Sequence, residues 1–471
     1  MTDRWLSLAA LAACVFYGVV GWHLSESFMG WSEETMVFPT PAAQSLARDL
    51  DEHGDAVVER GCANEDAPTV LILDGRPRMV VCAAGRQWPL MIAGYLSGVF
   101  AWPIGLLSPL HHDNLLTLRK IALLFGLLSI YLSWRVVGTL AGKRAGLWVA
   151  LATAVTPIYI AAHSVWVAYE MAPWVFLLLA LCVALGIRTQ PGPLQRVAVA
   201  DANGHLATWR AAVAGLLVGA ALLTCLRHIV MIAPVVAVAW WTRRPAVRPS
   251  AVGYAAAASA IAVALTPVVL LAVLGADSGI PDKASGWQGA LTQQLGRPQY
   301  LARSAAGMVT LWSNLPHWLG PAFGDRPLSL PPLVPVTAAA VFVVVEGVRV
   351  VRRRSTDLVS GAVGVAMVCY IVMVASLYSS FPYNFTPLAP LFGVAGGMAL
   401  SRLEAWLTPR GRLLSLSTAL FLPATLAWGA TQVVSTARGA PIFANIDVER
   451  AATAFLVENR SEEDTSELQS P

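Results

Sequence analysis

Charged residues are scarce in this chain, and their scarcity excludes most soluble folds. Only 13% of the 471 residues are charged and 56% are hydrophobic, with a mean hydropathy of +0.61. These values are typical of a polytopic membrane protein, whose solvent is the bilayer. Lysine occurs only at Lys120, Lys143 and Lys283. Most arginines lie in short loops between apolar segments, so the net charge of +4 indicates membrane orientation and no nucleic-acid partner.

Three further absences narrow the function classes. The sequence has no Gly-rich phosphate loop or Walker sequence, which argues against a nucleotide-sugar enzyme or an ATP-driven pump. It has no internal repeat, a common feature of secondary transporters. No small-residue cleavage site follows the first apolar run, so we expect that run to stay in the protein as a helix.

Cysteine is also rare, and its six positions divide into two groups. Four cysteines lie inside apolar segments and are expected to be small core residues: Cys14, Cys182, Cys225 and Cys369. Cys62 and Cys82 lie in the polar stretch after the first helix, where a disulfide between them is expected if that stretch faces an oxidising compartment.

What the chain does have is a series of apolar runs long enough to span a bilayer, for which about 17 to 25 residues suffice. The expected spans are Trp5–Trp22, Leu116–Val137, Gly146–His163, Met171–Ile187, Ala211–Leu226, Ile229–Trp241, Ala251–Leu274, Leu333–Val350, Leu358–Ser376, Asn384–Arg402 and Leu413–Val434. The sequence thus predicts an all-α polytopic membrane protein with about 11 transmembrane helices. Residues 211–241 could also form one long tilted helix instead of two short ones.

One more apolar stretch, Gln87–Leu107, is long enough to cross but is not expected to do so. If it crossed, every short basic loop downstream would lie outside, against the positive-inside rule. We therefore expect a juxtamembrane or re-entrant helix bounded by Pro89 and Pro103, with the N-terminus inside. This topology gives external loops at 23–115 and 275–332 and an external stub at 435–459, within a transmembrane domain of residues 1–459.

The last residues, 460–471, differ sharply from the rest. The segment RSEEDTSELQSP is polar and resembles a translated sequencing adapter, so we expect it to be non-native. A genuine disordered tail is the alternative.

The order of motifs resembles a known family. The chain has a first helix, an external loop with early acids, and then LRKIALLFGLLSIYLSWRVVG, a basic turn and AVTPIYIAAHSVWVAYEMAPWVFLLLAL. Together with SFPYNFTPLAPLFGVAGGMAL, this order resembles the GT-C membrane glycosyltransferases. Within them it is most similar to the protein O-mannosyltransferase and aminoarabinose lipid A transferase branch.

The resemblance implies a reaction and a place for it. A GT-C enzyme moves a sugar from a polyprenyl-phosphate donor to a protein, lipid or glycan acceptor at the outer face of the membrane. Few lysines beside abundant arginine, alanine and valine indicate a GC-rich bacterial genome, so we expect a bacterial inner membrane protein whose external site faces the periplasm. Such chemistry needs a carboxylate that deprotonates the acceptor or binds a divalent cation, Mg²⁺ or Mn²⁺, and cations that hold the leaving phosphate.

Three acids match the catalytic positions of the family. Glu34, or its neighbour Glu33, stands where the family has its first-loop acid, although the family usually has Asp there. Glu170, in YEMAP, stands where the family often has Asp before MP. The alternatives are an exposed acid at a helix start for the pair and a carboxylate at headgroup level for Glu170.

Cationic and aromatic residues in the later segments are candidates for donor binding. Arg227 and His228 follow an apolar helix, where an arginine can grip a phosphate with two hydrogen bonds or anchor the chain at the interface. Tyr383 occupies the late tyrosine motif, and Arg297 and Arg303 belong to an external segment that could cover the site. His111 and His112 are adjacent and so diverge on a helix, and no metal site is expected from them.

Two other function classes remain open from the sequence. A secondary transporter or lipid flippase would also be a bundle of many helices, but it usually has ionisable residues near the midplane. An accessory membrane protein without catalysis would fit the missing Asp.

Overall fold

The structure is a computed structural model that describes part of the 471-residue chain. The described residues are 3–27, 68–73, 76–83, 86–93, 96–97, 102, 115–156, 159–160, 163, 168–185, 208–225, 228–229, 231–232, 251–265, 341–346, 348–349, 358–377 and 387–407.

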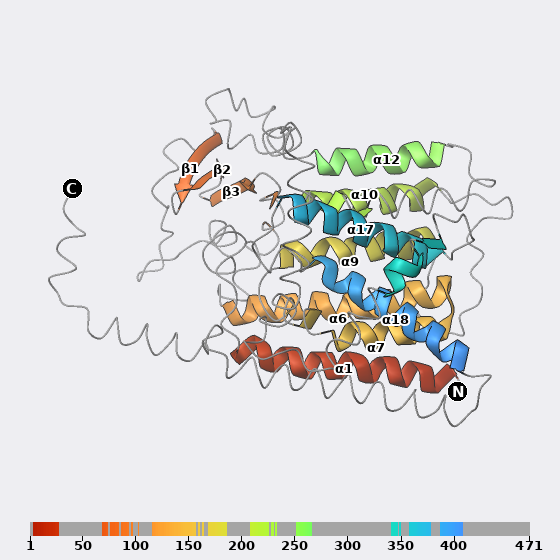
Figure 1. Cartoon of the computed structure of the whole chain (residues 1–471). Helices are drawn as coiled ribbons and strands as arrows, with labels where there is room; N and C mark the ends of the chain where they lie inside the picture. Colours follow the sequence, from red (N-terminus) through yellow and green to blue (C-terminus); the bar gives the residue numbers. More distant parts are fainter. Residues whose placement is uncertain are drawn as a thin grey trace, which may run out of the picture.

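Long helices form the body of the molecule (Figure 1). They are α1 (Asp3–Ser27), α6 (Leu115–Leu140), α7 (Lys143–Ala154), α9 (Ala168–Leu185), α10 (Thr208–Thr224), α12 (Ala251–Ala264), α17 (Leu358–Leu377) and α18 (Ala389–Leu407). Each overlaps an expected span, which confirms the helical prediction for these segments. The total of about 11 spans stays a prediction, because Leu413–Val434 and parts of other spans lie outside the described residues.

One helix boundary differs from the sequence prediction, and another decides between two alternatives that the sequence left open. The third span was expected to reach His163, but α7 ends at Ala154, shortly before Pro157. The ring of a proline disfavours helical backbone at the residue before it, which explains an end here. The helix α10 ends at Thr224, ahead of Leu226, so the chain does not continue as one long helix through residues 211–241.

A small antiparallel sheet corrects the all-α prediction. Its strands are β1 (Pro68–Leu73), β2 (Arg76–Ala83), β3 (Arg86–Ala93) and β4 (Leu96–Ser97), paired in the order β1-β2-β3-β4. The expected juxtamembrane helix at Gln87–Leu107 is therefore wrong over β3 and β4.

The sequence contains the cause of this sheet. Each connection between strands has two residues, and the first of them is the pair Asp74-Gly75, a strong signal for a two-residue hairpin turn. Pro89 pairs with Val80 next to a shift in register between β2 and β3. A bulge is one of the few places where a strand tolerates proline, so Pro89 lies at an irregularity of a strand and does not end a helix.

Small residues allow the helices to approach closely. In α18, a Cβ on Gly393 or Gly397 would come within 3 Å of atoms of Thr153 or Val149 of α7. In α10, a Cβ on Gly219 would likewise come within 3 Å of the carbonyl oxygen of Ala260 of α12. Apolar contact in lipid brings no hydrophobic gain, so close packing through a small-xxx-small spacing is what holds such helices together.

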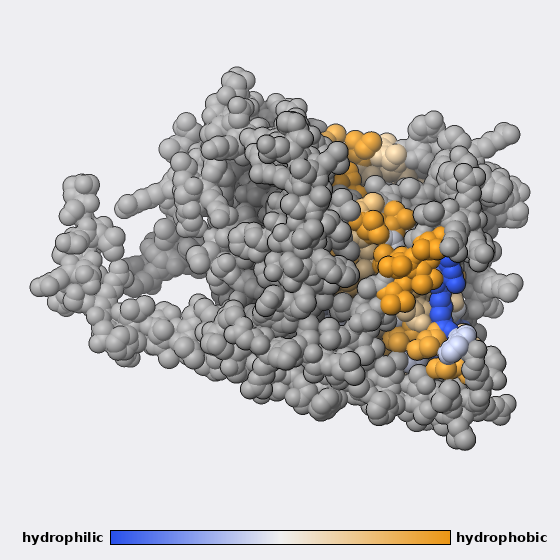
Figure 2. All heavy atoms as spheres, viewed as in Figure 1, coloured by the Kyte–Doolittle hydropathy of each residue, from blue (hydrophilic) through white to orange (hydrophobic). Residues whose placement is uncertain are grey.

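Apolar side chains also cover the outside of the bundle. On α1 an outward stripe is exposed, formed by Leu8, Leu11, Val15, Val19 and Trp22. Figure 2 shows hydrophobic residues across the middle of one face, with hydrophilic ones toward one end. Among the described residues, one helix (Leu118–Leu140) is long and apolar enough to cross a membrane by length and composition, and several shorter apolar helices accompany it. This surface suits lipid and fits an integral membrane protein.

The two ends of the bundle are distinct. The sheet lies at one end, with β4 in contact with α10, while the N-terminal end of α1 lies at the other (Figure 1). We call these the sheet end and the opposite end. Ser27 at the close of α1 and Leu115 at the start of α6 both lie at the sheet end.

Candidate active site at the sheet end

A buried arginine joins α1 to α6 at the sheet end. Arg119, in the second turn of α6, is fully buried, and its Nη1 donates a hydrogen bond of 3.0 Å to the carbonyl oxygen of Ser25. The last carbonyls of a helix have no partner inside the helix and carry its partial negative charge, so a cation is stabilised there. This bond fixes the point at which the first long loop leaves α1.

A second cation lies beside Arg119. The ammonium nitrogen of Lys120 lies 4.0 Å from the ring centroid of Trp22 on α1, within the range of a cation–π interaction. Two consecutive positive charges thus lie where the chain leaves α1. Such an environment favours a negatively charged group, either a carboxylate or a phosphate.

The expected first-loop acids follow directly from this point. Glu33 and Glu34 lie outside the described residues, but Glu33 is only eight residues along the chain from Ser25. An extended chain spans at most about 3.6 Å per residue, so the Cα atoms of Glu33 and Glu34 lie within about 29 Å and about 32 Å of that of Ser25. Their positions relative to Arg119 stay a prediction.

The second expected acid belongs to the same end. Glu170 is the third residue of α9, which packs against α6, and its side chain is outside the described part. Arg135, near the end of α6, and Cys182, near the end of α9, are neighbours, so the two helices run in the same direction. Glu170 therefore lies near the end of the bundle at which α6 begins.

The donor-binding candidates are only partly described. His228 is buried beyond the end of α10, and its backbone N–H donates to the carbonyl oxygen of Cys225 at 3.2 Å. The other four candidates, Arg227, Arg297, Arg303 and Tyr383, lie outside the described residues, as do His111 and Cys62.

Comparison with known proteins finds likeness in structure and none in sequence. No protein-family model matches the chain, and no curated protein matches its sequence. The oligosaccharyltransferase AglB from Archaeoglobus fulgidus, solved with an inhibitory peptide and a dolichol-phosphate, matches 92% of this chain and 56% of its own, at 12% identity and a TM-score of 0.50. The chain therefore shares its fold with this oligosaccharyltransferase.

A second solved structure is similar over a larger share of its own length. ArnT from Cupriavidus metallidurans, bound to undecaprenyl phosphate, matches 93% of this chain and 78% of its own, at 13% identity and a TM-score of 0.48. The chain spans little more than half the length of the archaeal oligosaccharyltransferase. The fold shared with AglB agrees with the fold that the sequence resemblance implies.

Arg119 is not among the site residues predicted from the sequence. The signal was present, because an arginine inside the first turns of an apolar segment is costly in a membrane and usually marks a function or a buried partner. The sequence analysis treated it only as part of the motif LRKIALLFG.

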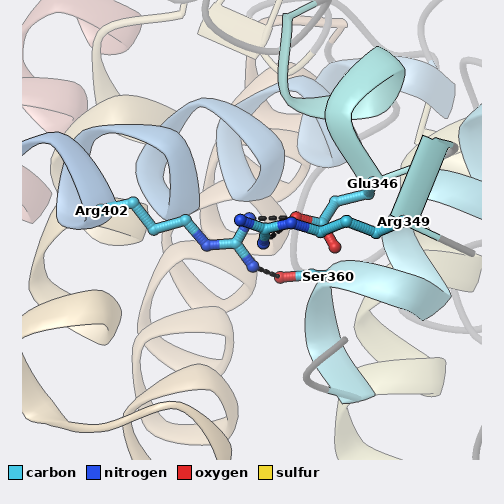
Figure 3. A network of polar contacts seen from close by, with 4 residues as sticks. All are labelled: Glu346, Arg349, Ser360 and Arg402. Atoms are coloured by element: carbon cyan, nitrogen blue, oxygen red, sulfur yellow. Dashed lines mark hydrogen bonds and ion pairs between the residues drawn. The ribbon is translucent and has the colours of Figure 1, made fainter. Parts of the chain in front are cut away.

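The opposite end carries a second polar network that the sequence analysis also missed (Figure 3). Glu346 is buried, and its Oε1 accepts hydrogen bonds from Arg402 of α18 and from Arg349, the latter at 3.0 Å. Arg402 also donates to the hydroxyl of Ser360 of α17 at 2.8 Å. These contacts join three helices far from the sheet end.

A neighbouring contact fixes α18 to α7. The indole Nε1 of Trp148 donates to Glu404 at 2.8 Å, and Arg144 lies 3.6 Å from the other carboxylate oxygen. Arg144 lies in the first turn of α7, which begins at the opposite end, and Glu404 lies in the last turn of α18, so α18 starts toward the sheet end. The segment that contains Tyr383 precedes that start.

The described residues include no group of three His, Cys, Asp or Glu side chains that could hold a metal ion. The side chains described at the sheet end, Arg119 and Lys120, are cationic and fit an anion. The carboxylates that could bind Mg²⁺ or Mn²⁺ are those of Glu33 and Glu34, outside the described part.

Proposed function

We propose that this protein is a membrane glycosyltransferase that moves a sugar from a polyprenyl-phosphate donor to an acceptor at the external face of the membrane. The observation that carries the proposal is the buried Arg119, which ties the end of α1 to α6 at the start of the two-acid loop. The GT-C fold supports the same reading.

The transfer requires one bond to form and one to break. A lone pair of the acceptor oxygen attacks the anomeric carbon, and the bond between that carbon and the phosphate oxygen breaks, with its electron pair leaving on the phosphate. The acceptor proton goes to a carboxylate, for which Glu34 is our first assignment and Glu33 the second. The polyprenyl phosphate leaves with one more negative charge than it had as the sugar ester.

Cations at the sheet end would stabilise that developing charge. Lys120 of α6 lies beside Trp22, near the end of α1 that precedes Glu33 and Glu34. The further candidates for binding the donor phosphate and sugar are Arg227, His228, Arg297, Arg303 and Tyr383. Preorganised donors aimed at the group that gains charge are usually the largest contribution to catalysis. Glu170 would orient the acceptor or share the role of base.

The sheet end would face the outside of the cell. Basic residues of the described helices gather toward the opposite end, where Lys143, Arg144, Arg349 and Arg402 lie, and the positive-inside rule places that end in the cytoplasm. An external site must draw its energy from an activated lipid donor, which agrees with the absence of a nucleotide-binding motif in the sequence. The acceptor is a protein, lipid or glycan that reaches the periplasmic surface of the inner membrane.

The test is sugar transfer by the full-length chain in vesicles. A panel of radiolabelled polyprenyl-phosphate sugars is offered to wild type, Glu34→Gln, Glu33→Gln and Glu170→Gln at matched expression. We expect one first-loop variant to lose at least about 100-fold in rate, the usual contribution of a general base. The control is Arg144→Gln, an exposed residue at the opposite end, which should transfer at the wild-type rate.

The alternatives give different results in the same assay. A transporter, flippase or inactive accessory protein would transfer sugar from none of the donors. If transfer occurs and all three acid variants transfer at the wild-type rate, these acids take no part in the mechanism.

A further inference from the structure

A buried aromatic cluster lies below the candidate active site, between α1 and α6. Its members are Tyr17 of α1, Tyr159 and His163, all almost completely buried. The rings of Tyr159 and His163 lie 4.3 Å apart, and Tyr17 approaches Tyr159 at 5.5 Å and the edge of His163 at 6.2 Å. Tyr17 is eight residues from Ser25, so the cluster lies about 12 Å deeper along the helix axis.

Gly126 of α6 is the point at which these side chains meet. A Cβ at this position would overlap the hydroxyl of Tyr17 and lie 2.8 Å from Cγ of His163. The hydroxyl of Tyr159 donates a hydrogen bond of 2.7 Å to the carbonyl oxygen of Gly126. The polar group of Tyr159 is thereby satisfied, while Tyr17 and His163 approach the same glycine.

The hydrogen bonds of His163 define what its free nitrogen can do. Its Nδ1 lies 2.9 Å from the carbonyl oxygen of Tyr159. A carbonyl only accepts, so Nδ1 carries the proton, and Nε2 of the neutral ring is an acceptor.

A hydrogen-bond acceptor and a hydrogen-bond donor therefore remain without partners in this cluster. Within the described part of the chain, neither Nε2 of His163 nor the hydroxyl of Tyr17 has a hydrogen-bond partner, and both atoms are buried. Buried polar groups without a partner are costly and rare, above all in a membrane. One is an acceptor and the other can donate.

We propose that Tyr17 and His163 form a binding site for a single hydroxyl group, which accepts a hydrogen bond from Tyr17 and donates one to Nε2 of His163. Among the residues that the structure describes around this cluster, the members are uncharged, so an ion would not be compensated by them, whereas a hydroxyl satisfies both groups at once. A bound water and a sugar hydroxyl of the lipid-linked donor share this chemistry. The water needs no enzymatic activity of the chain, and only the sugar hydroxyl rests on the proposed function.

Such a hydroxyl would connect α1 with the segment that leads to Glu170. His163 precedes Glu170 by seven residues, and Tyr17 belongs to the helix from which the first-loop acids depart. Tyr17 and His163 are therefore proposed as positioning residues for both acid-bearing segments.

The test uses Tyr17→Phe, which removes the hydroxyl and keeps the ring. If a bound hydroxyl bridges the pair, this change removes a hydrogen bond and lowers the apparent unfolding midpoint of the detergent-purified full chain by about 1–2 °C. The same change should have little effect in the His163→Leu background, because the bridge is already broken there. His163→Gln retains an acceptor and should restore part of the effect of Tyr17→Phe.

An unfolding midpoint that stays unchanged or rises in Tyr17→Phe overturns the proposal. If the Tyr17 hydroxyl is simply unpaired, Tyr17→Phe relieves the cost of burying it and the midpoint stays or rises. That result in the free protein and with each added lipid would refute a bound hydroxyl, whatever happens to the His163 variants.

Added lipids distinguish the two sources. The midpoints are measured without lipid, with a polyprenyl phosphate and with the polyprenyl-phosphate hexose. A loss in the lipid-free protein identifies water, and this result stands even if the chain transfers no sugar. A loss that appears only with the hexose identifies a sugar hydroxyl.

Discussion

Replacing Glu346 by glutamine should destabilise the protein more than any single surface change. The carboxylate is 1% exposed and its Oε1 accepts from two guanidinium groups, so the neutral amide oxygen of glutamine would weaken both hydrogen bonds by removing the negative charge. It leaves Arg402 and Arg349 without their counter-charge.

The magnitude follows from the exposure of the three partners. Breaking a fully buried ion pair by removing one partner costs about 3–5 kcal/mol. The side chains of Arg402 and Arg349 are 33% and 43% exposed, so water compensates part of their lost interaction. We therefore expect a loss of about 2–4 kcal/mol, and a fall in the apparent midpoint of at least about 2–4 °C for a chain of this size.

The measurement is thermal unfolding in detergent, with Glu404→Gln as the matched control. The amide oxygen of glutamine can still accept the hydrogen bond from Trp148, so this change removes chiefly the pair with Arg144, whose side chain is 58% exposed and lies 3.6 Å away, and exposed pairs contribute about 0.2–1 kcal/mol. A shift for Glu346→Gln no larger than that for Glu404→Gln would refute the reasoning. The double change of Glu346 and Arg402 to methionine should recover most of the loss, because apolar packing often replaces a buried ion pair without cost.

Four other substitutions, at three positions, test the packing and the site. Gly397→Ala would place a Cβ 2.4 Å from the backbone of Val149 and should cost about 1–3 kcal/mol in midpoint measurements, whereas Gly138→Ala meets open space and should gain about 0.5–1 kcal/mol from helix propensity; equal effects would contradict the α7–α18 contact. Arg119→Gln should abolish sugar transfer and lower stability, because the carbonyl of Ser25 loses a charged donor. Arg119→Lys should retain more of both, and a neutral outcome for Arg119→Gln would remove this residue from the account.

The helices could be predicted from the sequence because apolar runs are a local property. The starts of α6, α17 and α12 lie within a residue of the expected spans at Leu116, Leu358 and Ala251. The end of α7 could have been placed better, since the effect of Pro157 on the preceding residue is also local. The strand pairing was missed although Asp74-Gly75 is a strong hairpin signal, because the apolar stretch Gln87–Leu107 was assigned from its length and from the positive-inside rule, neither of which tests for strands.

The polar networks could not be predicted in the same way. Glu346 and Arg402 are 56 residues apart, and nothing in the local sequence pairs them. The partnership of Arg119 with Ser25 joins residues separated by 94 positions. Each charge was visible in an apolar segment, but only the arrangement of helices determines which charges meet. The roles of Glu33, Glu34 and Glu170 rest on the family resemblance and stay predictions.

The central claim is that sugar leaves a polyprenyl phosphate at the external face, and its most direct test is a stoichiometric one. Sealed right-side-out vesicles containing the full chain receive a donor labelled in both sugar and lipid, together with extracts of protein, lipid and glycan acceptors. The account predicts that one polyprenyl phosphate is released outside for each sugar transferred, and that the Glu33→Gln/Glu34→Gln double variant releases none. Sugar that stays on its lipid while the labelled lipid moves across the membrane would contradict a transferase and identify a flippase.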